Sequence, residues 1–377
     1  GLQQLKGVGR LIDVFALKAE NLKHPDQKEY AENKITPHTG VEVPSIAILP
    51  LENKGKEEDS FYAYGIRADL ISDLSRAGRI RVASVKDIDA FDVGKLSSSE
   101  IAKKLDVRYV VDGMLWKHEN MFQLSIELND TKQNTVEWSD RWQEQWEELA
   151  SIKDILSENL LAALNLDSTH KDHTAGSKAN TESYEYYLKG KYRYEKRQSA
   201  EDIEIARGLF HKSIDLDNTN IRAQYELGCT YQDSAENGKA LAVFKESLAQ
   251  SEKINDDGGK ADGLRGMGWV YYDKCEYDKA LDCFARSLEL CIKIDDKKGC
   301  ALTHRGFVAV FAMTRDDERV LEYHALSRKI YEELNDKRGI SASLYNTGMI
   351  YRIKGEYDKG LECLKSVSCQ TMSGKLM

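Results

Sequence analysis

The sequence has little proline, no long apolar stretch and no surplus of positive charge. All four prolines lie at or before position 50, at 25, 37, 44 and 50. Because proline breaks helix interiors, the proline-free remainder favours long helices. No apolar run approaches the ~18 residues that a membrane-spanning helix needs. The net charge of -9 argues against a nucleic-acid-binding protein, whose footprint would be a basic stripe.

Cysteine lacks the spacing of a metal or redox site. All seven cysteines lie at or after Cys229, and no CxxC pair occurs. Cys275 and Cys283 fall in a stretch rich in tyrosine and acidic residues, but Cys291 is about 80° from Cys283 around a helix, so the thiols do not converge. We therefore expect reduced cysteines that pack as small apolar side chains. The sequence predicts no catalytic residue, no metal site and no cofactor.

The C-terminal half contains a forty-residue repeat. Several columns share this period: small residues, rings, a second set of small residues, and a second bulky set. They are Gly228, Gly268 and Gly348, with Val308 at the slot where the glycine is missing; Tyr231, Tyr271, Phe311 and Tyr351; Ala240, Ala280, Val320 and Gly360; and Phe244, Phe284, His324 and Leu364. The loops NDDGGK, DDKKGC and NDKRGI recur at 255, 295 and 335. Independent columns with one period indicate a stacked repeat architecture.

Each repeat has the pattern of two helices, as in 261–274 and 278–294, whose apolar residues fall at helical spacing. The small residues at the eighth and twentieth repeat positions, with bulky residues between them, resemble the tetratricopeptide repeat (TPR). This resemblance implies an α-solenoid over residues 182–377, with about five repeats. The first spans roughly 182–216, and we expect the last to be truncated.

The segment 44–166 has a different pattern, with an expected order β-α-β-α-β-β-β-α. A buried strand at 44–53 precedes a helix that contains Ile66 and Leu70. Ser97 and Glu100 predict a capping box at a second helix. Three alternating runs between 108 and 145 predict an antiparallel meander.

Four sequence motifs in this segment resemble the TolB-like N-terminal domain, which is found beside cyclase, kinase and winged-helix domains in bacterial signalling proteins. They are SIAILPLEN, YGIRADLISDLSR, IAKKLDVRYVVDGML and IELNDTKQNTVEWSDRW. The expected fold class is therefore a small mixed-sheet α/β domain followed by an all-α solenoid. The resemblance implies binding or regulation for residues 44–166 rather than catalysis.

Two groups in this domain have alternative interpretations. Asp69 and Asp73 are one turn apart and could bind a cation, but a solvated helix face is the favoured interpretation. Trp138, Trp142 and Trp146 resemble a ligand shelf, but core packing at a strand-to-helix corner is favoured, because large aromatic residues dominate core burial.

Residues 1–17 resemble the last β-hairpin of class III nucleotidyl cyclase domains. The resemblance rests on Leu5, Lys6 and Gly7, followed by Val14, Phe15 and Leu17. It implies that the upstream chain is missing, that any cyclase catalytic residues lie upstream, and that the parent protein is a dimer. Since a cyclase works where ATP is, it also implies a cytoplasmic location.

Residues 18–43 and 167–181 have the polar composition of linkers. The second linker contains His170 and His173, for which a solvated loop is favoured over a metal site.

Stacked repeats form a concave groove lined by their first helices. The outward positions hold arginine and aromatic residues, the types that carry interface energy. They are Arg222, Tyr225, Arg265, Trp269, Tyr272, Arg305, Tyr345 and Arg352. The arginines favour an acidic or C-terminal-carboxylate peptide as partner. Ordinary surface and inter-repeat packing explain the same residues, and both interpretations remain open.

The first functional hypothesis is a non-catalytic regulatory and scaffold segment of a cyclase-type signalling protein, which binds a protein partner through the TPR groove. The alternative is that the same TolB-TPR module belongs to a transcriptional regulator or a protein kinase. The residues upstream of position 1 would discriminate the two.

Overall fold

A computed structural model of the chain describes residues 2–3, 12–13, 43–90, 92–166 and 180–372. Residues 1–42 and 43–377 form separate units. In the first unit, β1 (Leu2–Gln3) pairs antiparallel with β2 (Ile12–Asp13). The words that suggested a cyclase hairpin, at 5–7 and 14–17, lie outside the described residues, as do most of the two expected linkers and both linker histidines.

The second unit begins with a mixed sheet. Its strands are β3 (Ser45–Ile48), β4 (Glu52–Asn53), β5 (Arg81–Val82), β6 (Tyr109–His118), β7 (Met121–Asp130) and β8 (Thr135–Gln145). Their order is β5-β3-β6-β7-β8, with β4 beside β6. β3 is parallel to β5 and β6, whereas β6, β7 and β8 form the predicted antiparallel meander. Along β7 every second residue is buried, as period-two alternation requires.

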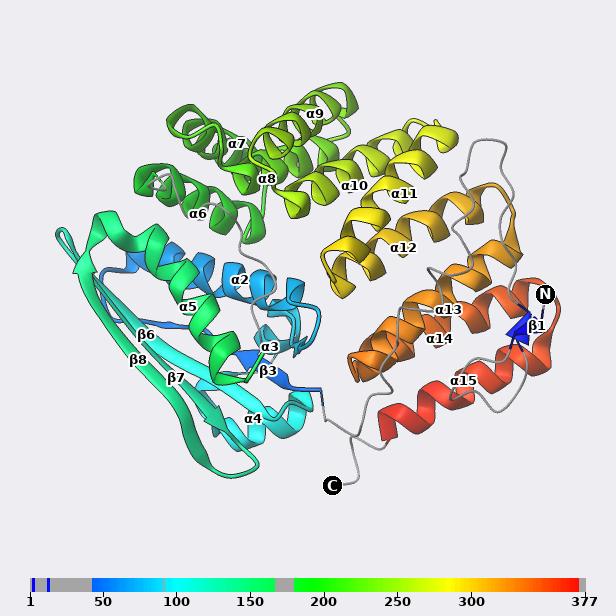
Figure 1. The fold of residues 1–377 in the computed structure, drawn as a ribbon, viewed down its shortest axis with the longest axis horizontal. Coiled ribbons are helices and arrows are strands. Elements are labelled where there is room, and N and C mark those ends of the chain that lie inside the picture. Colours follow the sequence, from blue (N-terminus) through cyan, green and yellow to red (C-terminus); the bar gives the residue numbers. More distant parts are fainter. Residues whose placement is uncertain (1, 4–11, 14–42, 91, 167–179, 373–377) are drawn as a thin grey trace. The chain divides into compact units, whose positions relative to one another are not determined.

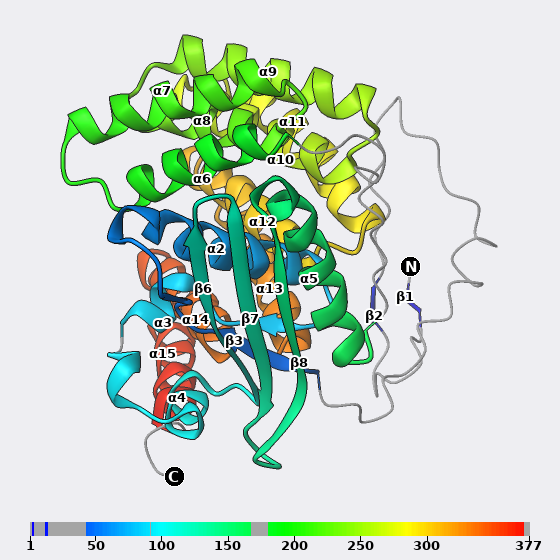
Figure 2. The same cartoon turned by 90° about the vertical axis from the view of Figure 1, so that its left-hand side faces the viewer.

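Four α-helices accompany the sheet: α2 (Ser60–Arg76), α3 (Val85–Asp89), α4 (Ser98–Leu105) and α5 (Leu149–Ala163). Short 3-10 turns are η1 (Glu57–Asp59), η2 (Val93–Lys95) and η3 (Trp146–Glu148). The capping box of Ser97 and Glu100 is confirmed. The strand expected at 44–53 is divided into β3 and β4, and α3 was not expected from the sequence. Figures 1 and 2 show α2 and α5 on the same face of the sheet, between it and the helices that follow.

The rest of the unit is an array of helix pairs (Figure 1). The pairs are α6 (Thr181–Glu195) with α7 (Ala200–Leu216), α8 (Ile221–Asp233) with α9 (Asn237–Lys253), α10 (Asp257–Asp273) with α11 (Tyr277–Lys293), α12 (Lys297–Met313) with α13 (Asp317–Glu333), and α14 (Lys337–Ile353) with α15 (Tyr357–Met372). The predicted fold class, a mixed-sheet α/β domain followed by a helical solenoid, is confirmed.

The recurring loops explain where the helices begin and end. Asn255, Asp295 and Asn335 adopt left-handed backbone conformations, with φ of 57°, 55° and 52°, and stop the preceding helices. The next aspartate in each loop caps the following helix by accepting a hydrogen bond from a backbone N–H in its first turn. These helix stops and caps recur with the forty-residue period of the array.

The glycine column lets neighbouring helices approach closely. A Cβ added at Gly228 would lie 2.5 Å from the ring of Phe244, and one at Gly268 would lie 2.6 Å from the ring of Phe284. Because any other residue at these positions would displace a buried ring, glycine is required for packing rather than for a turn.

One hydrophobic core joins the sheet domain to the start of the array. The same cluster contains the α2 residues Ile66 and Leu70 and the array residues Tyr187 and Phe210. A Cβ added at Gly65 of α2 would lie 2.5 Å from Leu188 of α6. The first helix pair is therefore packed against α2 by close apolar contact.

Candidate functional site

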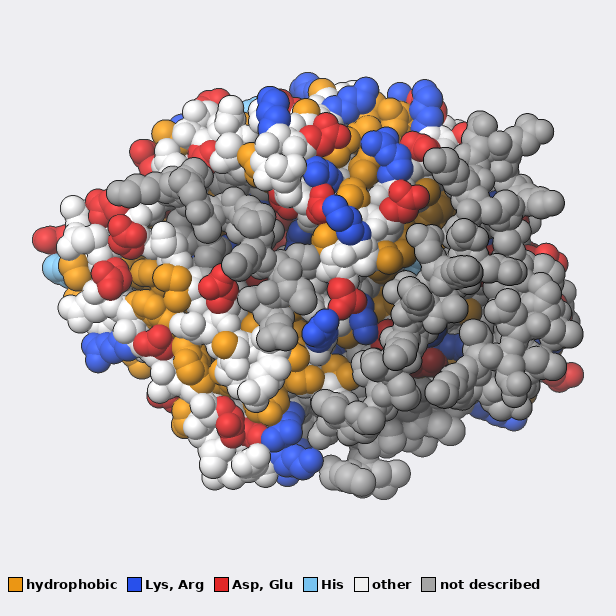
Figure 3. All heavy atoms as spheres, in the orientation of Figure 1, with side chains coloured by type: hydrophobic (Ala, Val, Ile, Leu, Met, Phe, Trp, Pro, Cys, Tyr) orange, Lys and Arg blue, Asp and Glu red, His pale blue; other side chains and the backbone are white. Residues whose placement is uncertain are grey.

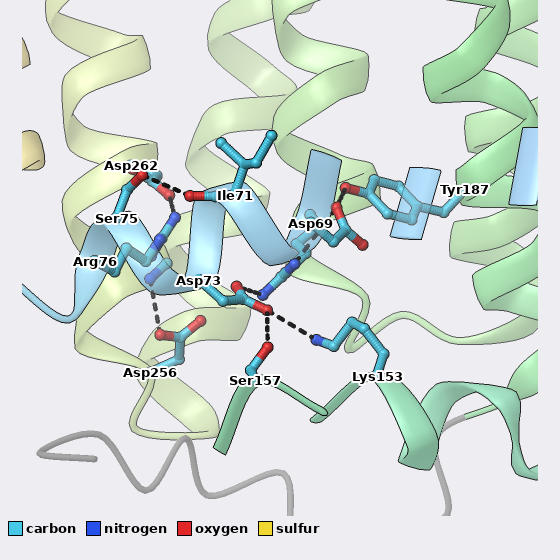
Figure 4. Close-up of polar contacts among 12 residues, drawn as sticks. Asp69, Ile71, Asp73, Ser75, Arg76, Lys153, Ser157, Tyr187, Asp256 and Asp262 are labelled. Atoms are coloured by element: carbon cyan, nitrogen blue, oxygen red, sulfur yellow. Dashed lines mark hydrogen bonds and ion pairs between the residues drawn. The ribbon is translucent and has the colours of Figure 1, made fainter. Parts of the chain in front are cut away.

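Helix α2 lies against the first helices of successive pairs in the array. Its apolar contact is with α6, whereas its later residues form polar contacts with α8, α10 and α12. Figure 4 shows Asp69, Asp73 and Arg76 along this side of α2. The concave face that the sequence assigned to a partner is thus covered in part by a helix of the same chain.

Asp69 is fully buried at the centre of this contact. Its carboxylate accepts hydrogen bonds from the hydroxyls of Tyr187 (2.8 Å) and Tyr184 (3.0 Å) and pairs with Lys191 Nζ at 2.8 Å. Burial opposes the charge, but Lys191 and Arg222 outweigh it and hold the pKa of Asp69 below its ordinary value. The buried carboxylate is therefore ionised and paired.

Asp73 lies one turn further along α2 and joins three elements. It pairs with Arg222 of α8, and with Lys153 of α5 at 3.4 Å. Arg222 also reaches Asp69, at 3.5 Å. Burial raises the pKa of Asp73, but the two cations lower it further than burial raises it. The expectation that Asp69 and Asp73 form a solvated face is wrong, because α6 and α8 cover that face.

Arg76 ends α2 and pairs with Asp262 of α10, which also pairs with Arg265 of the same helix. Arg265 is 7% exposed, and its Nη1 has no hydrogen-bond partner within the described part of the chain. Burial raises the pKa of Asp262, but Arg76 and Arg265 together lower it. An arginine–aspartate–arginine chain thus links α2 to the array.

More exposed polar contacts surround this centre. Lys298 Nζ of α12 donates to Ser75 Oγ at 3.3 Å. Arg79 lies 3.6 Å from Asp295, and Lys337 of α14 lies 2.7 Å from Asp106. Arg338 pairs with Asp87 of α3. The contact therefore extends from α6 to the beginning of α14.

A polar cavity of about 500 Å³ lies between α2 and the array. Its lining includes Lys191, Glu226, Arg265 and Lys298. Burial raises the pKa of Glu226 to about 7, and Lys191 only partly opposes this. Positively and negatively charged side chains line this cavity, so it is a charged cavity and not a hydrophobic pocket.

The predicted groove residues fall into three environments. Arg222, Tyr225 and Arg265 line the cavity beside α2. Trp269 and Tyr272 are half-buried and pack together and against Phe284 and Tyr277 respectively, so packing within the helix pair of α10 and α11 accounts for them. The remaining three are exposed and are not covered by α2: Arg305, Tyr345 and Arg352.

Sequence reasoning missed the α2 side of the site. It named Asp69 and Asp73 as a solvated pair or a cation site, and it did not name Arg76 or Asp262. The available signal was the spacing of Asp69, Asp73 and Arg76, which places them on one side of a helix.

The other candidate groups are structural. Trp138, Trp142 and Trp146 are partly buried against the main core, as the favoured interpretation expected. Cys283 and Cys291 are buried among apolar side chains, while Cys275 is exposed in its turn. Across the described ranges, no three histidine, cysteine or acidic side chains form a group that could hold a metal ion.

Two further findings concern surfaces. In the described part of the chain, no helix is both long enough and apolar enough to cross a membrane. On the face drawn in Figure 3, lysine and arginine are interspersed with aspartate and glutamate rather than gathered in a stripe.

Comparison with known proteins supports the repeat assignment. Residues 219–293 match the tetratricopeptide repeat family. The chain is 24% identical over 178 residues to "Putative adenylate cyclase 3" of Rhizobium meliloti (strain 1021), a match that covers 46% of this chain and 30% of that protein. The chain therefore spans less than a third of the length of this curated relative.

Solved structures show distant similarity to portions of the chain. MamA is 18% identical, with a TM-score of 0.38, and the match covers 50% of this chain and 97% of MamA. TolB from Acinetobacter baumannii is 20% identical, with a TM-score of 0.26, and the match covers 33% of this chain and 29% of TolB. The strand order, the helix pairs and the family match together show a small mixed-sheet domain followed by a tetratricopeptide-like solenoid.

Proposed function

We propose that this chain is a non-catalytic regulatory and scaffold segment of a cyclase-type signalling protein, and that it binds a protein partner through the concave face of its repeats. The observation that carries the proposal is the set of exposed groove residues beyond α2: Arg305, Tyr345 and Arg352. Arginine and tyrosine anchor interfaces because they combine large contact area with directed hydrogen bonds.

The similarity of the chain to a protein named as an adenylate cyclase supports the signalling context. The TPR match supports partner binding, because stacked helix pairs create extended concave binding surfaces. We place the module in the cytoplasm, where a cyclase finds ATP. The parent would be a dimer through its cyclase domain, and the groove would relay partner binding to that domain.

Partner capture tests the groove. The tagged chain is incubated with a lysate of the source organism, and each captured protein is then purified and titrated against the chain. The Arg305→Glu/Arg352→Glu variant should bind the partner at least tenfold more weakly, since charge reversal converts attraction into repulsion.

The matched control is Lys245→Glu/Lys329→Glu, which reverses two exposed charges on the second helices α9 and α13. It should bind as the wild type does. Equal binding by the groove variant would contradict the proposal. A cyclic-nucleotide assay of the fragment should detect no product, and the gene sequence upstream of residue 1 should encode a cyclase domain rather than a winged-helix or kinase domain.

A further inference from the structure

We propose that α2 is an internal ligand of the repeat groove, and that the groove binds an external helix with the same arrangement of charges when α2 is released. The partner helix would carry two carboxylates one turn apart and a cation about one turn beyond them. This proposal rests on the proposed function and names the class of partner for the covered part of the same groove.

The contact of α2 with the array has two chemically different parts. Near its beginning, α2 packs on α6 through close apolar contact, with Gly65 against Leu188. From Asp69 onward, its contacts with α8, α10 and α12 are ion pairs and hydrogen bonds. The charged cavity lies beside this second part. Separation is therefore expected to begin between α2 and α8, α10 and α12. Lys191 of α6 becomes available only when its pair with Asp69 also opens.

The groove recognises a defined pattern on α2. Asp69 and Asp73 stand at i and i+4, and Arg76 follows at i+7, so all three project from one side of the helix. Cations from α6 and α8 receive the two carboxylates. Asp262, a carboxylate from α10, receives the arginine (Figure 4). A mixed pattern of this kind specifies both the position and the direction of a bound helix.

Ionic contacts of this type favour exchange over permanent docking. Desolvation offsets much of the attraction in a buried ion pair, so such pairs give more specificity than net stability. α2 keeps the site because it is tethered, which gives it a high effective concentration. An external helix can therefore enter only when the charges of α2 are weakened or the tethered contact opens.

Peptide binding to the full chain tests this proposal. The probe is a fluorescein-labelled, terminally blocked peptide of residues 60–76, and binding is measured by fluorescence anisotropy. Arg76→Glu places a carboxylate of α2 opposite Asp262 and weakens the internal contact. This variant should bind the peptide at least tenfold more tightly than the wild-type chain does.

Two controls and a second release variant make the result specific. A peptide with Asp69→Asn and Asp73→Asn should bind at least tenfold more weakly to the same variant. Arg193→Glu, at an exposed ion pair with Asp202 between α6 and α7, should leave peptide binding at the wild-type level. If Arg76→Glu lacks a cooperative melting transition, Asp73→Asn replaces it, because this change weakens the pair with Arg222.

The proposal is overturned if neither release variant binds the peptide more tightly than the wild type, or if the neutralised peptide binds equally well. Either result leaves the proposed function intact when partner capture still depends on Arg305 and Arg352. Conversely, loss of that dependence with a positive peptide result would reject the proposed function alone.

Discussion

The concave face has one part that α2 covers and another that α2 leaves exposed. Residues at the same repeat position occur in both parts. Tyr225, Arg265, Arg305 and Tyr345 recur every forty residues on successive first helices. Tyr225 and Arg265 line the gap against α2, whereas Arg305 and Tyr345 are exposed to solvent. Equivalent repeat positions thus have different roles, and a second domain decides which positions remain available to a partner.

The largest loss of stability is expected in the part of the concave face that α2 covers. Asp69→Ala should lower the free energy of unfolding by about 3–5 kcal/mol, because it leaves Lys191 and Arg222 without their buried counter-ion. Chemical denaturation measures this. Asp282→Ala, at an exposed pair with Arg286, is the control and should cost less than about 1 kcal/mol. Similar losses for the two variants would show that Asp69 is not buried as described.

A smaller effect is expected at the apolar junction of α2 with α6. Gly65→Ala should destabilise the protein by about 1–3 kcal/mol, because the new Cβ meets Leu188. Gly208→Ala provides the contrast, since a Cβ there meets nothing within 4 Å. That change in helix α7 should stabilise the protein by about 0.5–1 kcal/mol. Thermal melting of both variants measures the difference, and equal shifts would contradict the close junction.

The charged cavity predicts a pH dependence that Glu226→Gln should remove. The folded-state pKa of Glu226, about 7, lies above its ordinary value of 4.5. The stabilisation from protonated Glu226 is therefore complete below pH 4.5 and is lost as the pH rises through 7.

At pH 8, Glu226→Gln should be more stable than the wild type by about 1–3 kcal/mol, and near pH 4.5 the two should be similar. Denaturation at several pH values measures this. Lys191, Glu195, Asp69 and Asp262 also act on Glu226 and contribute to the exact midpoint. A difference in stability that does not change with pH would contradict the assignment.

The smallest effect is expected at the margin of the contact. Asp87→Asn removes the partner of Arg338, in a pair whose two side chains are 31% and 58% exposed. Water and salt screen such a pair, so the loss should stay below about 1 kcal/mol and shrink at high salt. A loss of unfolding free energy as large as that of Asp69→Ala would contradict the distinction between the buried ion pairs at the centre of the contact and the exposed pairs around it.

Prediction from the sequence succeeded where the signal is local. The antiparallel meander follows from alternation, and the capping box follows from the spacing of Ser97 and Glu100. It failed for Asp69 and Asp73, because two acidic residues one turn apart suit a solvated helix face as well as they suit a buried face with ion pairs. It also missed the break between β3 and β4 within the strand expected at 44–53, and it missed α3, which at five residues carries too little pattern to be detected.

By itself, the sequence determined that this protein has a mixed-sheet domain followed by stacked helix pairs with a forty-residue period. Helix caps, glycines at close helix contacts and apolar helix faces are patterns that involve residues near in the sequence or that repeat along it. They can therefore be recognised in the chain. Only the tertiary structure decided that α2 lies in the groove and that Asp69 is buried. The reason is that burial and charge pairing across 122 residues, as between Lys191 and Asp69, depend on how distant elements pack.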